Sequence, residues 1–254
     1  LLPPMDESVP TMERPLRVLA TETPHTSFLK ISEGCDHSCA FCAIPLMRGL
    51  HRSSPVHELV REARALERQG VRELNLISQD TTWYGRDLKR SGGEGGLLPG
   101  LLEALLQGTE IPWFRLFYMY PSGITPDLVE LLARESRLLP YLDMPIQHGV
   151  DRMLEAIRRP ERVETIRTKV GWLRSPIPGL TLRTTVIVGF PGETDEDFQG
   201  LLDLLEEIRF DRVGAFTFSI EDGTRAATMD GQLPEEVKAH RLEALMELQR
   251  EISF

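Results

Sequence analysis

The hydrophobic and polar positions along the chain alternate between short apolar runs and longer segments with helical spacing. Six runs are rich in β-branched and aromatic residues, which is typical of strands; they cover 28–32, 71–78, 113–120, 141–144, 181–188 and 213–219. Between and after them, apolar residues recur every three or four positions, which predicts helices. These helices cover 97–107, 126–136, 149–158, 161–174 and about 234–252.

Two more helices have clear signals at their ends. Ser54 is expected to cap a helix that has Pro55 at its first position and that stops at Gly70. Thr194 is expected to cap another, since acidic side chains suit the positive end of a helix dipole and the first turn there contains Asp195, Glu196 and Asp197.

The repeated strand–helix units predict the fold class. They indicate an α/β domain built on a parallel sheet with right-handed crossovers. Six units predict an incomplete (β/α)6 barrel of the TIM type, with the helices outside. Residues 1–24 contain five prolines and no sustained period. We therefore expect a linker over 1–24 and one core domain over 25–254.

Composition narrows the classes of partner. The 254 residues are enough for one barrel domain. Because 39 acidic and 29 basic residues give a net charge of −10, the chain repels phosphate, which favours a basic protein over nucleic acid as a partner. The sequence has no run of about 18 apolar residues, so no membrane span is expected.

The three cysteines carry the clearest chemical signal. Cys35, Cys39 and Cys42 fall within one short segment, directly after the first predicted strand. An odd, clustered set is not a disulfide framework, and in a cytosolic enzyme such a cluster indicates metal binding. Three thiolates at this spacing can bind three corners of an iron–sulfur cube and leave one iron open for chemistry.

Two other interpretations of the cysteines stay open. One is a structural zinc site with His37 or His25 as the fourth ligand, although zinc sites usually have a second ligand pair that this sequence lacks. The other is a set of ordinary buried thiols, which would not be expected to gather in one loop. The corresponding functional alternative is a binding module that a metal bound to the cysteines stabilises.

The spacing Cys-x3-Cys-x2-Cys, with Phe41 just before the third cysteine, resembles the radical S-adenosylmethionine superfamily. The wider context resembles its methylthiotransferases over about residues 16–254. The segments that carry this resemblance are 29–35, 43–49, 77–81, 84–85, 118–121, 142–149, 183–193, 214–219 and 223–224.

Two branches of that family differ in substrate. One modifies an adenosine in tRNA and typically has Gly-Gln-Asn after the second strand. The other adds a methylthio group to the β-carbon of an aspartate in ribosomal small-subunit protein twelve. Segments 78–81, 118–122, 143–148 and 214–218 resemble the second branch. A tRNA methylthiotransferase remains the alternative, and the acidic charge is unfavourable to it.

The resemblance implies a specific set of cofactors. Cys35, Cys39 and Cys42 would hold a 4Fe-4S cluster whose open iron binds S-adenosylmethionine. One electron, from a flavodoxin- or ferredoxin-like donor, would cleave the sulfonium and give a 5′-deoxyadenosyl radical. A second 4Fe-4S cluster is expected in an N-terminal domain outside this sequence. A TRAM domain, also outside this sequence, is expected after the helix at 234–252. The resemblance also implies a cytoplasmic location.

Reactive groups of a barrel lie at the carboxyl ends of its strands, which selects further candidates. Phe41 is expected to contact adenine or to pack under the cysteine loop. Gln79 is expected to hold the methionine amino group or to stabilise a turn. Gln147 follows the fourth strand. Gly189 is expected to let the backbone approach the adenine, and also to form a tight turn.

Arg183 and Asp143 form a linked prediction. Arg183 alternates with Thr185 and Ile187 on one face of the fifth strand. If that face lines the barrel, Arg183 binds the carboxylate of S-adenosylmethionine. The alternative is an ion pair with Asp143, and the two roles are compatible. Asp143 is thus a further candidate at the cofactor site.

Two residues are candidates for catalysis, and two are expected to be structural. Asp80 follows the second strand. His148 is a candidate for moving a proton or contacting the substrate aspartate; the alternative is a structural histidine with satisfied hydrogen bonds. His37 is expected to face solvent, and Lys30 to form an ion pair inside the barrel.

Overall fold

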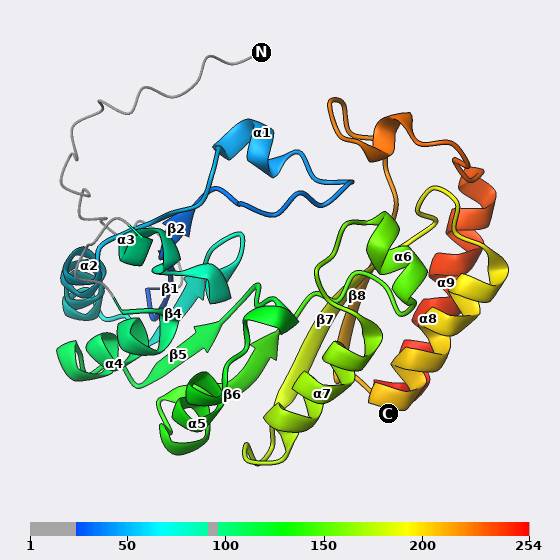
Figure 1. Cartoon of the computed structure of the whole chain (residues 1–254). Coiled ribbons are helices and arrows are strands. Elements are labelled where there is room, and N and C mark those ends of the chain that lie inside the picture. Colours follow the sequence, from blue (N-terminus) through cyan, green and yellow to red (C-terminus); the bar gives the residue numbers. More distant parts are fainter. Residues whose placement is uncertain (1–23, 91–95, 254) are drawn as a thin grey trace.

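A computed structural model describes residues 24–90 and 96–253. Its centre is a six-stranded sheet in which every neighbouring pair of strands is parallel, so the predicted fold class is confirmed. Figure 1 shows the sheet as an open, curved fan with helices along its outer side. The strand order is β1 (Thr26–Lys30), β4 (Glu73–Ile77), β5 (Trp113–Leu116), β6 (Leu138–Asp143), β7 (Thr181–Val188) and β8 (Arg212–Thr217).

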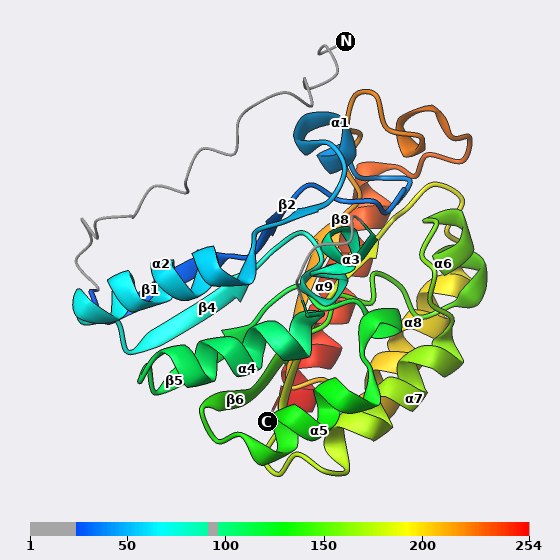
Figure 2. The ribbon, with the colours of Figure 1, turned by 60° about the vertical axis from the view of Figure 1, so that its left-hand side comes forward.

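The helices cover the outer face of the sheet. Figure 2 shows α2, α4, α5 and α7 along that face and α1 beyond the end of the sheet. The bounds are α1 Ile44–Arg48, α2 Val56–Arg68, α3 Arg86–Arg90, α4 Leu98–Gly108, α5 Pro126–Arg134, α6 Asp151–Ala156, α7 Val163–Arg174, α8 Asp195–Ile208 and α9 Glu235–Ser253. Within the described ranges, none of these helices is long and apolar enough to cross a membrane.

The core lies between the sheet and the outer helices. Leu74 and Leu76 of β4 and Leu59 and Leu66 of α2 are fully buried in one hydrophobic cluster. Burial of such side chains contributes about 1.5–3 kcal/mol each. Along β7 the burial alternates, with Leu182, Thr184 and Val186 buried and Arg183 half-buried. The outer face of the sheet therefore builds the core, and the inner face is left for chemistry.

The ends of two helices test the predicted caps. Thr194 caps α8 in a reciprocal arrangement with Asp197, as predicted. In α2 the N-cap is Pro55 rather than Ser54, and Val56 is the first helical residue. The reason is that the Ser54 N–H donates to the Ile31 carbonyl, which holds Ser54 in the chain leading from the sheet.

A small antiparallel hairpin, β2 (Ser32–Glu33) with β3 (Arg52–Ser53), was not predicted. The expected strand 28–32 ends at Lys30, and the chain then leaves the main sheet. The hairpin joins the two ends of residues 34–51, which include the cysteines. Gly34, at φ 76°, makes this possible because the backbones of Gly49 and Leu50 lie against its Cα.

The predicted linker at 1–24 lies outside the described residues except for Pro24. The predicted third strand, 113–120, ends early at Leu116. Beyond it, Tyr118 has a left-handed backbone at φ 56°, so the chain turns at this point instead of extending. The turn brings Tyr118 and Tyr120 to the carboxyl edge of the sheet.

Candidate metal centre and cofactor pocket

The cysteine loop, residues 34–43, is fixed by backbone hydrogen bonds at several points. The Cys35 N–H donates to the Gly49 carbonyl at 3.1 Å, and the Ala40 N–H donates to the Ile157 carbonyl at 2.8 Å. The Ala40 carbonyl accepts from the N–H of Ala226 at 2.8 Å. The loop is therefore held from α1, from the end of α6 and from the segment between β8 and α9, which lie at the same end of the sheet (Figure 1).

All three cysteines are free thiols. Cys35 and Cys42 line a pocket of about 480 Å³ at the carboxyl ends of β1, β4 and β5. The other residues of this pocket, called the cluster pocket below, are Phe41, Ile44, Ser78, Gln79, Tyr118 and Tyr120. Placement at this edge follows the rule used to select the candidates.

A second pocket of about 390 Å³ adjoins the first, because Phe41 lines both. It is formed at the carboxyl ends of β7 and β8, and we call it the strand pocket. Its other residues are Gln147, Thr185, Ile187, Phe216, Thr217, Phe218, Ser219 and Glu221. The predicted inner face of β7 thus lines a cavity. The two pockets bring Phe41, Gln79 and Gln147 to one continuous site.

The thiols suit a cluster better than a single ion. Burial raises the pKa of the Cys35 thiol to about 11 and raises that of Cys42, so these groups bind as thiolates only with a strong positive centre beside them. Across residues 24–90 and 96–253, no three or more His, Cys, Asp or Glu side chains converge on one ion. A cube needs no such point, since each thiolate binds a different iron.

The proposed fourth ligands of the zinc alternative are placed elsewhere. His25 precedes β1 at the end of the strand opposite the cysteine loop. The Nε2 atom of His37 lies 2.7 Å from the Asp80 carboxylate. The three thiols of the loop fit a cluster with one iron open, and their role as its ligands stays a prediction.

The prediction that His37 faces solvent is wrong. Its side chain is 11% exposed, and its ring stacks on Tyr120 with centroids 4.1 Å apart. Trp83 contacts the ring edge. The reason is tertiary: aromatic residues from the ends of β4 and β5 close over the cysteine loop.

Asp80 contacts His37 of the cysteine loop and is 1% exposed. One carboxylate oxygen accepts from the N–H and hydroxyl of Thr82 and so caps a short 3₁₀ helix, Thr81–Trp83. The other oxygen meets His37. This geometry makes Asp80 a support for the cysteine loop; its catalytic role stays a prediction.

Arg183 and Asp143 are register partners on β7 and β6 and form an ion pair at 2.8 Å. Asp143 is fully buried, whereas the Arg183 side chain is 33% exposed. Burial raises the pKa of Asp143, and Arg183 opposes that rise. The ion-pair alternative is therefore present, and part of the guanidinium remains accessible for an anion.

The two glutamines reach the site in different ways. Gln147 has φ 70° and pairs its backbone with Thr185 and Ile187 of β7, which directs it into the strand pocket. Gln79 presents a buried side-chain oxygen that has no hydrogen-bond partner in the described part of the chain. A buried acceptor without a donor is costly, and this one lines the cluster pocket.

Gly189 and His148 lie away from these pockets. Gly189, at φ 73°, donates its N–H to the Glu193 carboxylate, and its Cα faces the Lys238 side chain of α9. The tight turn is present. His148 is fully buried; its Nδ1 accepts from the Val150 N–H, and burial lowers its pKa to about 4. The ring is thus buried as in the structural alternative, but only one nitrogen is satisfied, because the buried Nε2 has no hydrogen-bond partner among the described residues. The cofactor and catalytic roles of the two residues stay predictions.

Lys30 pairs with Glu33, as expected, near the cysteine loop. Arg159 is a residue that the sequence did not point to. It is buried beside Cys39 and Tyr120, yet in the sequence it belongs to an Arg-Arg-Pro segment after a helix, which resembles an ordinary basic helix end. No local pattern reveals its contact with the cysteine loop.

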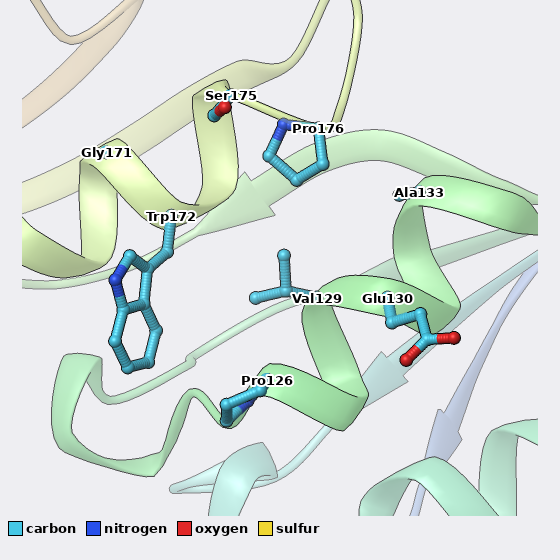
Figure 3. A pocket seen from close by; sticks show the side chains of 8 residues that line it. All are labelled: Pro126, Val129, Glu130, Ala133, Gly171, Trp172, Ser175 and Pro176. Atoms are coloured by element: carbon cyan, nitrogen blue, oxygen red, sulfur yellow. The ribbon is translucent and has the colours of Figure 1, made fainter.

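A further pocket lies on the outer surface between α5 and α7. Figure 3 shows Trp172 of α7 extending toward Pro126 and Val129 of α5, with Glu130 to one side. The Lys169 ammonium lies 4.0 Å from the Trp172 ring centroid. This pocket is formed by the outer helices and does not share residues with the cysteine site.

Comparison with known families agrees with this geometry. The model of the radical SAM superfamily matches residues 29–205, from within β1 to within α8. The match includes the cysteine loop and Gln79, Gln147 and Arg183. The chain belongs to the radical SAM superfamily.

Within that superfamily the chain is similar to proteins named ribosomal protein uS12 methylthiotransferase RimO. It is 52% identical to the one from Desulforudis audaxviator over 231 residues, which are 91% of this chain and 50% of that protein. It is 51% identical to the one from Symbiobacterium thermophilum over 237 residues, 93% of this chain and 48% of that protein. The chain spans about half the length of the curated relatives it matches.

Solved structures are similar in fold. Coproporphyrinogen III oxidase (HemN) from Escherichia coli, a radical SAM enzyme, has a TM-score of 0.66 over 90% of this chain and 54% of its own, at 17% identity. TsrM from Kitasatospora setae, with cobalamin and a [4Fe-4S] cluster bound, has a TM-score of 0.64 over 80% and 38%, also at 17%. These likenesses confirm the barrel fold.

Proposed function

We propose that this chain is the catalytic core of an enzyme that methylthiolates the β-carbon of an aspartate in ribosomal small-subunit protein twelve. The observation that carries the proposal is 52% identity to a uS12 methylthiotransferase over 91% of the chain. That stretch includes the three-cysteine loop and the two adjoining pockets.

Cys35, Cys39 and Cys42 would hold a 4Fe-4S cluster, and S-adenosylmethionine would bind across the pockets that meet at Phe41. When bound, the two groups supply one-electron cleavage of the sulfonium to a 5′-deoxyadenosyl radical, which abstracts hydrogen from carbon. The protein positions these groups and keeps water away from them. The hydrophobic lining of both pockets supports that task.

Individual side chains support the binding of S-adenosylmethionine. The unpartnered Gln79 oxygen is an acceptor suited to an ammonium group. Arg183, held by Asp143 but still one-third exposed, is suited to a carboxylate. Phe41 and Gln147 are placed to contact the adenosyl part, because both line the strand pocket.

The proposal extends to the surroundings of this core. It includes a linker over 1–24, an N-terminal domain with a second 4Fe-4S cluster, and a TRAM domain after α9. It also includes a cytoplasmic location and an electron donor of the flavodoxin or ferredoxin class. A basic substrate protein suits the net charge of −10.

A chimera tests the substrate. The matching half of the Desulforudis audaxviator relative is replaced by this chain, and the reconstituted, reduced chimera is given S-adenosylmethionine and either the ribosomal protein or unmodified tRNA. We expect the mass of one methylthio group on an aspartate of the protein. The same chimera with Cys39→Ala serves as the inactive control. A methylthio group on tRNA adenosine instead would overturn the assignment.

A further inference from the structure

A stack of three largely buried side chains, Tyr120, His37 and Arg159, lies beside Cys39. The Tyr120 hydroxyl lies 3.5 Å from the Cys39 sulfur. One face of the Tyr120 ring stacks on His37, with centroids 4.1 Å apart and an angle of 6° between the rings. The Arg159 guanidinium carbon lies 3.7 Å from the Tyr120 ring centroid.

Arg159 brings a full positive charge into this stack. Its side chain is 1% exposed, and it interacts with the Cys39 side chain as well as with Tyr120. One guanidinium nitrogen donates to the Pro145 carbonyl at 2.7 Å. Its Nε lies 3.2 Å from Glu161, which is equally buried. Burial of a charge this deep is costly, so its position beside a sulfur ligand calls for an explanation.

Glu161 holds the arginine in place. Its carboxylate accepts from the hydroxyl of Ser122 at 2.8 Å and from the Ser122 N–H at 3.2 Å. The carboxylate is thereby fixed beside Arg159. Of the two opposite charges, that of Arg159 interacts with the Cys39 side chain, and that of Glu161 is paired with Arg159.

A cluster gains negative charge when it accepts an electron. A positive charge and an O–H donor beside a ligand sulfur stabilise the reduced form more than the oxidised form, which raises the reduction potential. The low dielectric of a buried site strengthens the effect.

We propose that Arg159 and Tyr120 are positioning residues that raise the reduction potential of the cluster through Cys39, with Glu161 as the counter-charge that limits this effect. The inference rests on the proposed cluster at Cys35, Cys39 and Cys42. It adds a function to residues that otherwise would only fill the space behind the loop.

The test is a redox titration of the reconstituted chain, without S-adenosylmethionine. Dithionite supplies single electrons through mediators, and electron paramagnetic resonance measures the ratio of reduced to oxidised cluster. At a fixed solution potential, Arg159→Gln is expected to lower this ratio at least ten-fold. This corresponds to a reduction potential lower by 59 mV for a one-electron couple. Tyr120→Phe, which keeps the ring stack, is expected to lower it less.

Two charge variants test the direction of the change in the ratio of reduced to oxidised cluster. Glu161→Gln is expected to raise the ratio, since it removes the negative counter-charge, and Arg159→Lys is expected to retain most of the wild-type ratio. Arg137→Gln is the control: Arg137 also makes several partly buried hydrogen bonds to backbone carbonyls, but at the other end of the barrel. Its ratio is expected to equal that of the wild type.

Several outcomes would overturn the inference. Iron is counted for every variant, so that only chains with about four irons are compared. Equal ratios in wild type, Tyr120→Phe and Glu161→Gln would contradict it while leaving the cluster assignment intact. Shifts of the same sign for Arg159→Gln and Glu161→Gln would show a purely structural role. A wild-type chain that binds no cluster would overturn both the inference and the proposed function.

Discussion

At the scale of single residues, Gln79 is a sensitive probe of the cofactor pocket. Its buried oxygen lacks a donor in the described structure, so an ammonium group of a ligand would satisfy it. Gln79→Ala is expected to weaken the binding of S-adenosylmethionine to the reconstituted chain about ten-fold, because a hydrogen bond to a charged group contributes about 1.5–3 kcal/mol. Isothermal titration calorimetry measures the dissociation constant.

Two variants control this experiment. Gln79→Glu keeps an oxygen acceptor and is expected to retain the affinity. Gln199→Ala makes the same truncation on the exposed face of α8 and is expected to have no effect. An unchanged dissociation constant for Gln79→Ala would remove Gln79 from the proposed site.

His148 gives a prediction about pH. Its ring is neutral in the folded chain because burial lowers its pKa from 6.5 to about 4. As the pH falls from 6.5 toward 4, the unfolded chain takes up the proton first, so this contribution to stability is present above pH 6.5 and is lost as the pH approaches 4. The loss is about 3 kcal/mol of the free energy of unfolding.

The measurement compares wild type with His148→Asn, whose side-chain oxygen can replace Nδ1 as the acceptor of the Val150 N–H. Urea titrations at several pH values between 4 and 7.5 give the free energy of unfolding of each. As the pH falls, the free energy of unfolding of wild type is expected to decrease more than that of His148→Asn. Parallel pH profiles would mean that His148 is solvated in the folded chain.

At the scale of elements, the hairpin β2–β3 is what shapes the cysteine loop. Gly34 and Gly49 both have a positive φ, but an added Cβ at Gly34 would overlap the carbonyl of Leu50, whereas one at Gly49 meets no atom within 4 Å in the described structure. Gly34→Ala is expected to lower the free energy of unfolding by about 3 kcal/mol, from strain plus overpacking, and to lower iron bound per chain.

Gly49→Ala is the matched control for this element. It also places a Cβ on a backbone with positive φ, which strains any L side chain, but without the overlap. Iron per chain is therefore expected to stay near that of wild type. If both variants lose iron equally, the close contact between the two sides of the hairpin does not shape the loop.

The strands and outer helices could be predicted from the sequence because their patterns are local. The apolar positions of β7 alternate with the face that includes Arg183, and the capping box of Thr194 is complete within four residues. The hairpin could not be predicted, since strands of two residues have no period. His37 was misplaced because its burial depends on Tyr120, which is 83 positions away in the chain. Arg159 was missed for the same physical reason.

At the scale of the whole molecule, the curved sheet gathers at one edge the groups that the chemistry requires. The cysteine loop follows β2, Gln79 follows β4, Tyr120 follows β5 and Gln147 follows β6. Figures 1 and 2 show that the connections at this edge, including α1 and the segment before α9, lie over the same end of the barrel. One open end therefore contains the candidate site.

The central claim is that this end holds a cluster that cleaves S-adenosylmethionine. The most direct measurement reconstitutes the chain with iron and sulfide without oxygen, reduces it, adds S-adenosylmethionine and quantifies 5′-deoxyadenosine together with iron. The account predicts about four irons per chain and 5′-deoxyadenosine that is absent in Cys39→Ala. Bound zinc in place of iron, or a complete cluster that leaves S-adenosylmethionine intact, would contradict it.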